Sequence, residues 1–201
     1  PILEQAGLRP EDINSFEDFR KVPFMRKTDL RDNYPDGLFV VPYDDLVRIH
    51  VSSGTTGKPT VVGYTKKDLD NWTEALARGM TSFGVTKKDM VQNMHGYGLF
   101  TGGLGVHYGA ELIGATVLPI STGNTSRQIQ LMQDLPVTTL AGTPSYYFHI
   151  ADVCDQMGVD IRKDTKVRKG IAGGEPWSES MRKKLEERTG IKTYNCYGAS
   201  E

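Results

Sequence analysis

Short apolar runs alternate with longer segments of helical periodicity from about residue 46 to the end of the chain. In the segment 66–83 apolar residues recur every three or four positions, which predicts an amphipathic helix whose Trp72 belongs to the core. Further helices are predicted at 144–157 and 179–189, and strands at 46–51, 61–64, 90–94, 115–120, 138–141, 169–173 and 192–196. This alternation is typical of an α/β fold in which helices flank a mixed or parallel sheet.

Local signals refine these helices. Asn124 is a suitable N-cap for a helix that begins near Thr125, because its side chain can accept a hydrogen bond from a free backbone N–H group. In the helix at 179–189, Met181 and Leu185 are expected to point inward. The helix at 144–157 is expected to place four residues on one face: Tyr147, Ile150, Ala151 and Cys154.

The first 45 residues differ from the rest of the chain. They are charged, and Pro23, Pro35 and Pro42 interrupt their short helical patterns. We predict an irregular helical lead-in over residues 1–45 that packs on the main body, and an α/β region over residues 46–201. Because the chain opens inside a helical pattern and stops directly after a motif-like run, we expect it to be a piece of a longer protein.

The composition is that of an ordinary globular protein, with 38% apolar and 24% charged residues. A net charge of −1 gives no bulk electrostatic attraction to nucleic acid or to an anionic membrane. No apolar run approaches the roughly 20 residues that a membrane helix needs. Cys154 and Cys196 lie far apart without chelating spacing, so we expect reduced thiols and a cytoplasmic location.

The segment Ser52–Thr60 joins two predicted strands and has the composition of a phosphate-binding loop. Its hydroxyls and glycine N–H groups are hydrogen-bond donors, and Lys58 adds a positive charge. It is not a Walker A loop, because only two residues separate Gly54 from Gly57 and Pro59 follows the lysine. An ordinary polar turn has a similar composition, so the loop alone leaves the two interpretations about even.

A glycine-rich segment, His95–Gly105, follows the strand predicted at 90–94. Thr101 occupies the place of the third glycine in the pattern G-x-G-x-x-G, so a dinucleotide-binding fold is disfavoured. Tyr97 and Phe100 could line an aromatic pocket for a flat ligand. They could equally fill the core beneath the start of a helix, and the residues alone do not separate these alternatives.

The segment Gly173–Trp177 lies at the carboxyl end of a predicted strand, where ligands gather in open α/β sheets. Pro176 fits the first turn of the following helix, and Glu175 could interact with the positive N-terminus of that helix. For these residues alone, helix capping is the simpler interpretation.

The segment Asn195–Glu201 leaves the last predicted strand. Tyr197 offers a flat face for a purine ring, and Glu201 offers a carboxylate oxygen of the kind that Mg²⁺ prefers. Taken singly, a tyrosine at a strand end and a solvated glutamate are the simpler interpretation.

These segments occur together and in this order in adenylate-forming enzymes, and the chain resembles the phenylacetate–coenzyme A ligase family in particular. The resemblance runs from about residue 20 to the end and rests on five segments: 52–60, 97–105, 107–111, 174–177 and 197–201. The first segment is shared by the whole superfamily, whereas 97–105 is much more specific to arylacetate ligases. The implied fold is that of an adenylate-forming N-terminal domain, truncated before the C-terminal lid domain.

The resemblance also implies a two-step reaction with ATP, Mg²⁺ and coenzyme A. A carboxylic acid attacks the α-phosphate of ATP to give an acyl-adenylate and pyrophosphate, and the thiol of coenzyme A then displaces AMP. The implied substrate is an arylacetic acid, phenylacetate or a related acid.

Each motif position takes an implied role from the same resemblance. The residues implied to hold the β- and γ-phosphates are Ser53, Gly54, Thr55, Thr56, Gly57 and Lys58. Those implied at the rest of the nucleotide are Gly174, Glu175, Pro176, Asn195, Tyr197, Gly198 and Ser200, with Tyr197 stacked on adenine. Those implied to line the acyl pocket are His95, Gly96, Tyr97, Phe100 and Cys196. Lys58 and Glu201 are the implied catalytic residues, and Glu201 is the implied Mg²⁺ ligand.

Three positions depart from the family pattern, which commonly has a tyrosine at His95, an aliphatic residue at Cys196 and a residue larger than Ala199. The first two touch the implied acyl pocket, so a hydroxylated or indole-bearing arylacetate would suit its more polar wall. His95 is expected to be a pocket or core residue and not a catalytic base.

Two other functions stay open beside the ligase. One is an adenylyl transferase that stops at a nucleotide adduct, as relatives acting on a deazaflavin coenzyme do. The other is a truncated, non-catalytic nucleotide-binding module. The expected partners are the C-terminal domain of the same polypeptide and a possible second copy, with no nucleic acid or membrane. By itself this chain is expected to bind nucleotide weakly and not to complete thioester formation.

Overall fold

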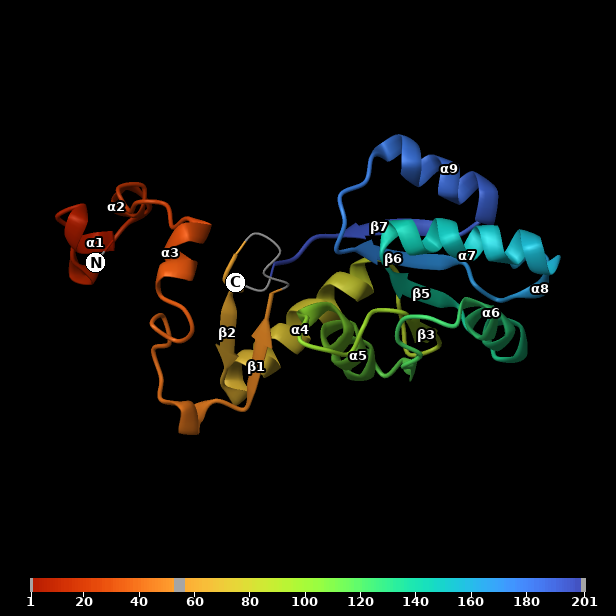
Figure 1. Cartoon of the computed structure of the whole chain (residues 1–201), viewed down its shortest axis with the longest axis horizontal. Helices are drawn as coiled ribbons and strands as arrows, with labels where there is room; N and C mark the ends of the chain where they lie inside the picture. The colour runs from red at the N-terminus through yellow and green to blue at the C-terminus, as the bar shows by residue number, and fades with distance from the viewer. Residues whose placement is uncertain (1, 53–56, 200–201) are drawn as a thin grey trace.

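The computed structural model of the chain describes residues 2–52 and 57–199 and is drawn in Figure 1. Within these residues, five parallel strands form one sheet in the order β4-β3-β5-β6-β7. They are β3 (Met90–Asn93), β4 (Thr116–Leu118), β5 (Thr139–Gly142), β6 (Lys169–Gly173) and β7 (Lys192–Cys196). The parallel sheet confirms the predicted α/β class.

Helices cover both faces of this sheet (Figure 1). On one face lie α4 (Lys66–Ser82) and α5 (Thr101–Ile113), and on the other α6 (Thr125–Asp134), α7 (Pro144–Met157) and α9 (Glu179–Thr189), with the short α8 (Ile161–Asp164) after α7. The predicted helix cap is confirmed, since Asn124 accepts a hydrogen bond from the Arg127 amide at 3.3 Å. The short α8 was not expected from the sequence pattern, and α5 was not among the predicted helices.

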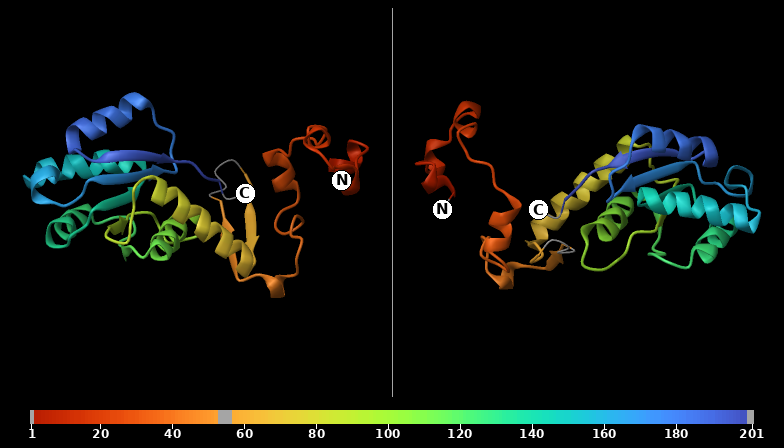
Figure 2. Two further views of the ribbon diagram at one scale, coloured as in Figure 1. Left: turned by 180° about the vertical axis from the view of Figure 1, so that it is seen from behind. Right: turned by 45° about the horizontal axis from the view of Figure 1, so that its top comes forward.

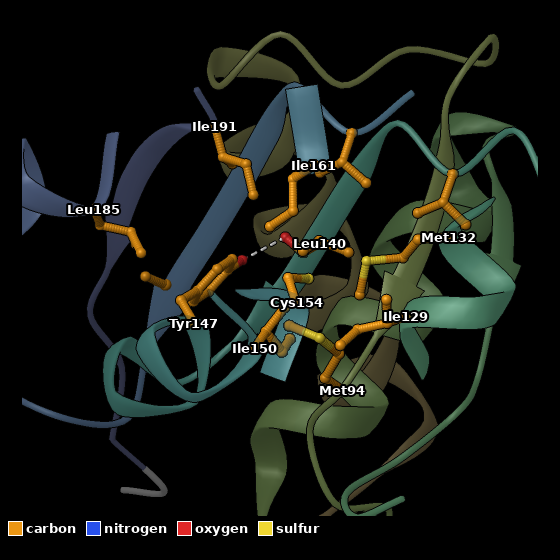
Figure 3. Close-up of a cluster of buried hydrophobic side chains, with 13 residues drawn as sticks. Met94, Ile129, Met132, Leu140, Tyr147, Ile150, Cys154, Ile161, Leu185 and Ile191 are labelled. Atoms are coloured by element: carbon orange, nitrogen blue, oxygen red, sulfur yellow. Dashed lines mark hydrogen bonds between the residues drawn. The ribbon is translucent and has the colours of Figure 1, made fainter. Parts of the chain in front are cut away.

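The larger core lies between the sheet and the helices α6, α7 and α9 (Figure 3). At its centre the fully buried Tyr147 donates its hydroxyl proton to Leu140 O at 2.7 Å, which satisfies the polar end of an otherwise apolar side chain. The other labelled members of this cluster are Met94, Ile129, Met132, Ile150, Cys154, Ile161, Leu185 and Ile191. The predicted inner face of α7 is therefore confirmed, because Tyr147, Ile150, Ala151 and Cys154 are all buried.

The expectation for α9 holds for only one of its two residues. Leu185 is fully buried, whereas Met181 is 38% exposed, so the inward placement of Met181 was wrong. The helix meets the core through its second half, where Leu185 and Thr189 are buried, and its first turn lies outside that contact.

A separate antiparallel pair, β1 (Arg48–Val51) and β2 (Val61–Tyr64), confirms both strands predicted around the candidate phosphate loop. This hairpin packs on α4, where the Trp72 ring lies edge-on to the His50 ring with 5.7 Å between centroids. Trp72 also lies 5.8 Å from the Tyr64 ring, which confirms it as a packing residue.

The N-terminal part of the chain extends away from the sheet as an arm and, contrary to expectation, does not pack on the sheet region (Figures 1 and 2). It contains the short helices α1 (Ile2–Gln5), α2 (Phe16–Phe19) and α3 (Lys27–Asp32), with 3-10 turns η1 (Pro10–Asp12) and η2 (Tyr43–Asp45). Large apolar side chains such as Phe16, Phe24 and Val40 are exposed along it. The division of the chain at residue 45 stays a prediction. Among the described helices, none is long and apolar enough to cross a membrane.

Candidate active site

The carboxyl ends of the parallel strands bring three of the sequence-predicted segments to one edge of the sheet. The loop 95–100 follows β3, Gly174 follows β6 and Tyr197 follows β7. The chain leaves β3 through α5 on one face and leaves β5 through α7 on the opposite face. Since β3 and β5 are neighbours, they form a topological switch point, the place where open α/β sheets bind ligands.

The hairpin of β1 and β2 closes the base of the candidate phosphate loop. Ser52 N donates to Thr60 O at 2.9 Å, and Thr60 N donates to Ser52 Oγ at 2.8 Å. Gly57 has a φ of 135°, a conformation that side chains rarely adopt. Lys58 is exposed, with its Nζ atom 5.5 Å from the centre of the Tyr34 ring. The predicted phosphate ligands Ser53, Gly54, Thr55 and Thr56 lie outside the described residues.

Two hydrogen bonds join this hairpin to the glycine-rich loop. His50 Nδ1 lies 2.9 Å from Leu99 O, and Val51 N donates to the same carbonyl at 3.0 Å. Because a carbonyl only accepts, the His50 ring must carry its proton on Nδ1. His50 was not expected in this role from the sequence, although a histidine between two apolar strand residues was the available signal. The candidate phosphate loop and the candidate acyl loop therefore share one anchor.

Tyr97 is held at the inner side of the glycine-rich loop. Asn93, fully buried at the end of β3, donates through Nδ2 to Tyr97 Oη at 2.7 Å and to Gly103 O at 2.7 Å. His107 Nδ1 lies 3.1 Å from the same tyrosine oxygen. Burial raises the pKa of Tyr97, so the phenol stays protonated. Neither Asn93 nor a role for His107 was expected from the sequence.

The remaining acyl-pocket candidates are His95, Cys196, Phe100 and Gly96, and none of them is charged at neutral pH. Burial lowers the pKa of His95, so its ring is neutral at pH 7. Burial raises the pKa of Cys196, so its thiol stays protonated. The Phe100 ring is half exposed, and Gly96 lies against the start of α5. The inward-facing part of this loop therefore carries no charge.

Glu175 caps a helix, but not the helix that follows it in the chain. Its carboxylate accepts hydrogen bonds from Ser145 N at 3.1 Å and from Ser145 Oγ at 2.8 Å, at the N-terminus of α7. The helix after Glu175 is capped instead by Ser178, whose Oγ accepts from Met181 N at 3.2 Å. The expectation that Pro176 occupies the first turn of that helix was wrong, because α9 begins only after Ser178.

The end of β7 leaves polar and aromatic groups at the surface. Tyr197 is 92% exposed, and Asn195 and Gly198 are exposed beside it. A Cβ atom on Gly173 would lie 2.5 Å from Cys196 O, which shows how closely the ends of β6 and β7 approach. Ser200 and the predicted Mg²⁺ ligand Glu201 lie outside the described residues. Within residues 2–52 and 57–199, no group of three or more His, Cys, Asp or Glu side chains could hold a metal ion.

Curated relatives match almost the whole chain. It is 49% identical over 197 residues to the phenylacetate-coenzyme A ligase of Pseudomonas putida, which covers 98% of this chain and 45% of that protein. It is 51% identical over 199 residues to the enzyme of the same name from Aromatoleum evansii, with 99% of this chain and 45% of that protein covered. The chain thus spans about half the length of the curated relatives it matches.

The fold has a solved counterpart in a crystal structure of an open conformation of 2-hydroxyisobutyryl-CoA ligase, in complex with 2-HIB-AMP and CoA. The TM-score is 0.91 at 29% identity, over 98% of this chain and 48% of that one. This similarity confirms the expected adenylate-forming fold. The family model described as AMP-binding enzyme matches residues 9–201. This chain belongs to the AMP-binding enzyme family.

Proposed function

We propose that this chain is part of an ATP-dependent ligase that joins an arylacetic acid to coenzyme A. In the first step a carboxylate oxygen of the acid attacks the α-phosphorus of ATP, and the bond to the bridging oxygen of pyrophosphate breaks. In the second step the sulfur of coenzyme A attacks the acyl carbon, AMP leaves and the thiol proton passes to solvent. Identity of 49–51% to phenylacetate-coenzyme A ligases along 98–99% of the chain is the observation that carries this proposal.

The proposed role of the exposed Lys58 is to stabilise negative charge on the departing phosphates. Phosphoryl-type chemistry depends mainly on positioning and charge stabilisation, so one cation at the correct place has a large effect. Glu201 is the residue proposed to hold Mg²⁺, which would neutralise further phosphate charge when bound. The 92% exposed Tyr197 offers its ring as a stacking surface for adenine.

The proposed acyl pocket lies along the loop 95–100 and the end of β7. Its candidates His95 and Cys196 are uncharged at neutral pH because burial shifts the pKa of each toward the neutral form. An uncharged wall that includes the Tyr97 ring suits a flat apolar group better than a second carboxylate. This supports an aryl acid as the substrate class.

The test uses the full reading frame that contains this chain. We expect exchange of pyrophosphate into ATP that depends on phenylacetate or a related arylacetate, and AMP release that depends on coenzyme A. Lys58→Ala is expected to lower kcat by about 10²-fold, the typical cost of removing one charge-stabilising group. Lys67→Ala, at an exposed lysine of α4, is the matched control and should keep the full rate.

Three outcomes would contradict the proposal. Exchange of pyrophosphate into ATP in the absence of any aryl acid would overturn the proposed activation of an aryl acid. Acid-dependent exchange without release of AMP on addition of coenzyme A would favour an adenylyl transferase. Equal losses in Lys58→Ala and Lys67→Ala would overturn the role of Lys58. The 201-residue chain by itself is expected to exchange pyrophosphate far more slowly than the full protein.

A further inference from the structure

The segment 107–111 helps to define the family resemblance, yet the proposed reaction gives it no role. His107 and Glu111 lie one turn apart on α5, and they form a series of hydrogen bonds that reaches Asn93 through Tyr97. His107 Nδ1 lies 3.1 Å from Tyr97 Oη, and His107 Nε2 lies 3.1 Å from Glu111 Oε1. This arrangement joins the surface of α5 to the loop that follows β3.

The partners set one direction for these hydrogen bonds when the His107 ring carries a single proton. The Glu111 carboxylate only accepts, so His107 carries a proton on Nε2. In the neutral ring Nδ1 then has a free lone pair and accepts the proton of the Tyr97 hydroxyl. On the other side Asn93 Nδ2 can only donate, so it occupies a lone pair of Tyr97 Oη at 2.7 Å. Each hydrogen bond from Glu111 through His107 and Tyr97 to Asn93 therefore joins one donor to one acceptor.

The environment supports this assignment. Asn93 is fully buried and its second amide proton is used by Gly103 O at 2.7 Å, so it cannot turn away. The Tyr97 and His107 rings meet edge to face, with 5.7 Å between centroids and an angle of 87°. The His107 side chain is 22% exposed, whereas Glu111 is 54% exposed, so only the outer end of the chain meets solvent. The tyrosine hydroxyl is thus engaged by protein atoms on both sides.

We propose that His107 and Glu111 are positioning residues that hold the Tyr97 hydroxyl toward α5, so that Tyr97 presents its ring and not its hydroxyl to the aryl group of the acid. This inference rests on the proposed function and deepens it. A hydroxyl group on the substrate ring finds no free donor at Tyr97, and a site that cannot pair a buried polar group discriminates against it. Unsubstituted phenylacetate is therefore preferred at this wall over its ring-hydroxylated forms.

The kinetic test compares variants that break the series of hydrogen bonds from Glu111 through His107 to Tyr97, called here the relay, with variants that keep it. His107→Leu and Glu111→Ala are expected to raise KM for phenylacetate about 3–10-fold, the effect of one lost hydrogen bond, and to leave KM for ATP within about 2-fold. His107→Asn keeps an acceptor close to the Nδ1 position, and Glu111→Gln keeps an acceptor oxygen, so both should retain most of the affinity. His149→Leu and Glu74→Ala are matched controls on exposed positions of α7 and α4, and neither should change KM.

The selectivity and coupling of the variants test the role of Tyr97 itself. With His107→Leu, the freed tyrosine hydroxyl should raise the ratio of kcat/KM for hydroxyphenylacetates to that for phenylacetate. Tyr97→Phe should not raise this ratio. The double variant Tyr97→Phe with His107→Leu should match Tyr97→Phe alone, because His107 acts through the hydroxyl.

A spectroscopic measurement checks the relay without any substrate. Long-range ¹H–¹⁵N spectra of the histidine rings should show the His107 proton on Nε2, with the His107 signals identified by their loss in His107→Asn. Tyr97→Phe should shift the His107 Nδ1 signal. A proton on Nδ1 would overturn the relay.

The outcomes also separate this inference from the proposed function. If wild-type protein shows no acid-dependent exchange, the ligase proposal fails and the pocket role falls with it. If exchange is present but His107→Leu raises the KM of ATP and acid equally, or the double variant is additive, only the positioning role is overturned.

Discussion

Adjacent glycines at the start of α5 should respond to alanine in opposite directions. A Cβ atom on Gly103 would lie 2.3 Å from Gly96 O, although real Cβ atoms essentially never come within 3.0 Å of a heavy atom. It would also meet Gly96 C at 3.0 Å and Tyr97 Cα at 3.5 Å. All three atoms belong to the backbone, so no side chain can rotate out of the way. The clash is relieved only if the loop 95–100 moves.

The expected cost of Gly103→Ala follows from this geometry. Forcing one extra carbon into a packed site destabilises a protein by about 1–3 kcal/mol, and a backbone clash belongs in the upper half of that range. For a chain of this size each 1 kcal/mol lowers Tm by about 2–4 °C, so we expect a fall of about 5–10 °C. KM for the aryl acid should also rise, because Gly103 O anchors Asn93 and through it Tyr97.

Gly102→Ala is the control one residue away. Its Cβ atom would be 3.8 Å from His95 Nδ1, an ordinary contact, and alanine is favoured over glycine in a helix by up to about 1 kcal/mol. Thermal unfolding followed by circular dichroism should show Tm unchanged or raised for Gly102→Ala and lowered for Gly103→Ala. Equal shifts for the two variants, or a stabilised Gly103→Ala, would refute the close-packing argument.

Three further predictions concern stability. Burial acts to raise the pKa of Asp89, but hydrogen bonds led by Lys169, at 2.8 Å, outweigh it and lower the pKa below its ordinary value. The charged carboxylate therefore stabilises the fold above about pH 4 and loses this effect as the pH falls further. Lys169→Met should lower the free energy of unfolding by about 2 kcal/mol at pH 7. This is less than the cost of breaking a fully buried ion pair, because the lysine is partly exposed. The same variant should unfold in acid at a higher pH than the wild-type protein. Glu175→Ala removes the cap on Ser145 N and should cost about 1 kcal/mol. Tyr147→Phe removes the hydrogen bond to a buried carbonyl and should cost about 1–2 kcal/mol.

Urea unfolding measures these changes, and each has a result that speaks against it. An unchanged acid-unfolding midpoint in Lys169→Met would show that the lysine does not set the pKa of Asp89, while the double variant with Asp89→Asn should recover part of the loss. Full stability of Glu175→Ala, with loss of nucleotide binding alone, would mean that Glu175 serves the ligand and not α7. An unchanged free energy of unfolding in Tyr147→Phe would show that the buried hydroxyl stabilises the fold no more than its hydrogen bonds to water stabilise the unfolded chain.

Local sequence signals predicted most elements of this fold because those signals act over a few residues. The Asn124 cap is an example, since the side chain bonds an amide three residues ahead. The prediction that Met181 points inward was wrong because periodicity gives the apolar face of a helix but not how far the core extends along it. The helix that Glu175 caps was misidentified for a related reason, since its partner Ser145 is 30 residues away.

The sequence by itself determined the α/β class, most of the helices and strands around the sheet, and the motifs that name the family. Only the tertiary structure decided which side chains meet: Asn93 and His107 at Tyr97, and His50 at Leu99. The β3–α5 crossover carries His107 back over the loop that holds Tyr97, and the β1–β2 hairpin reaches that loop from 49 residues earlier. These hydrogen bonds depend on the path of the loop after β3 and on where the separate β1–β2 hairpin packs, and periodicity along the chain records neither.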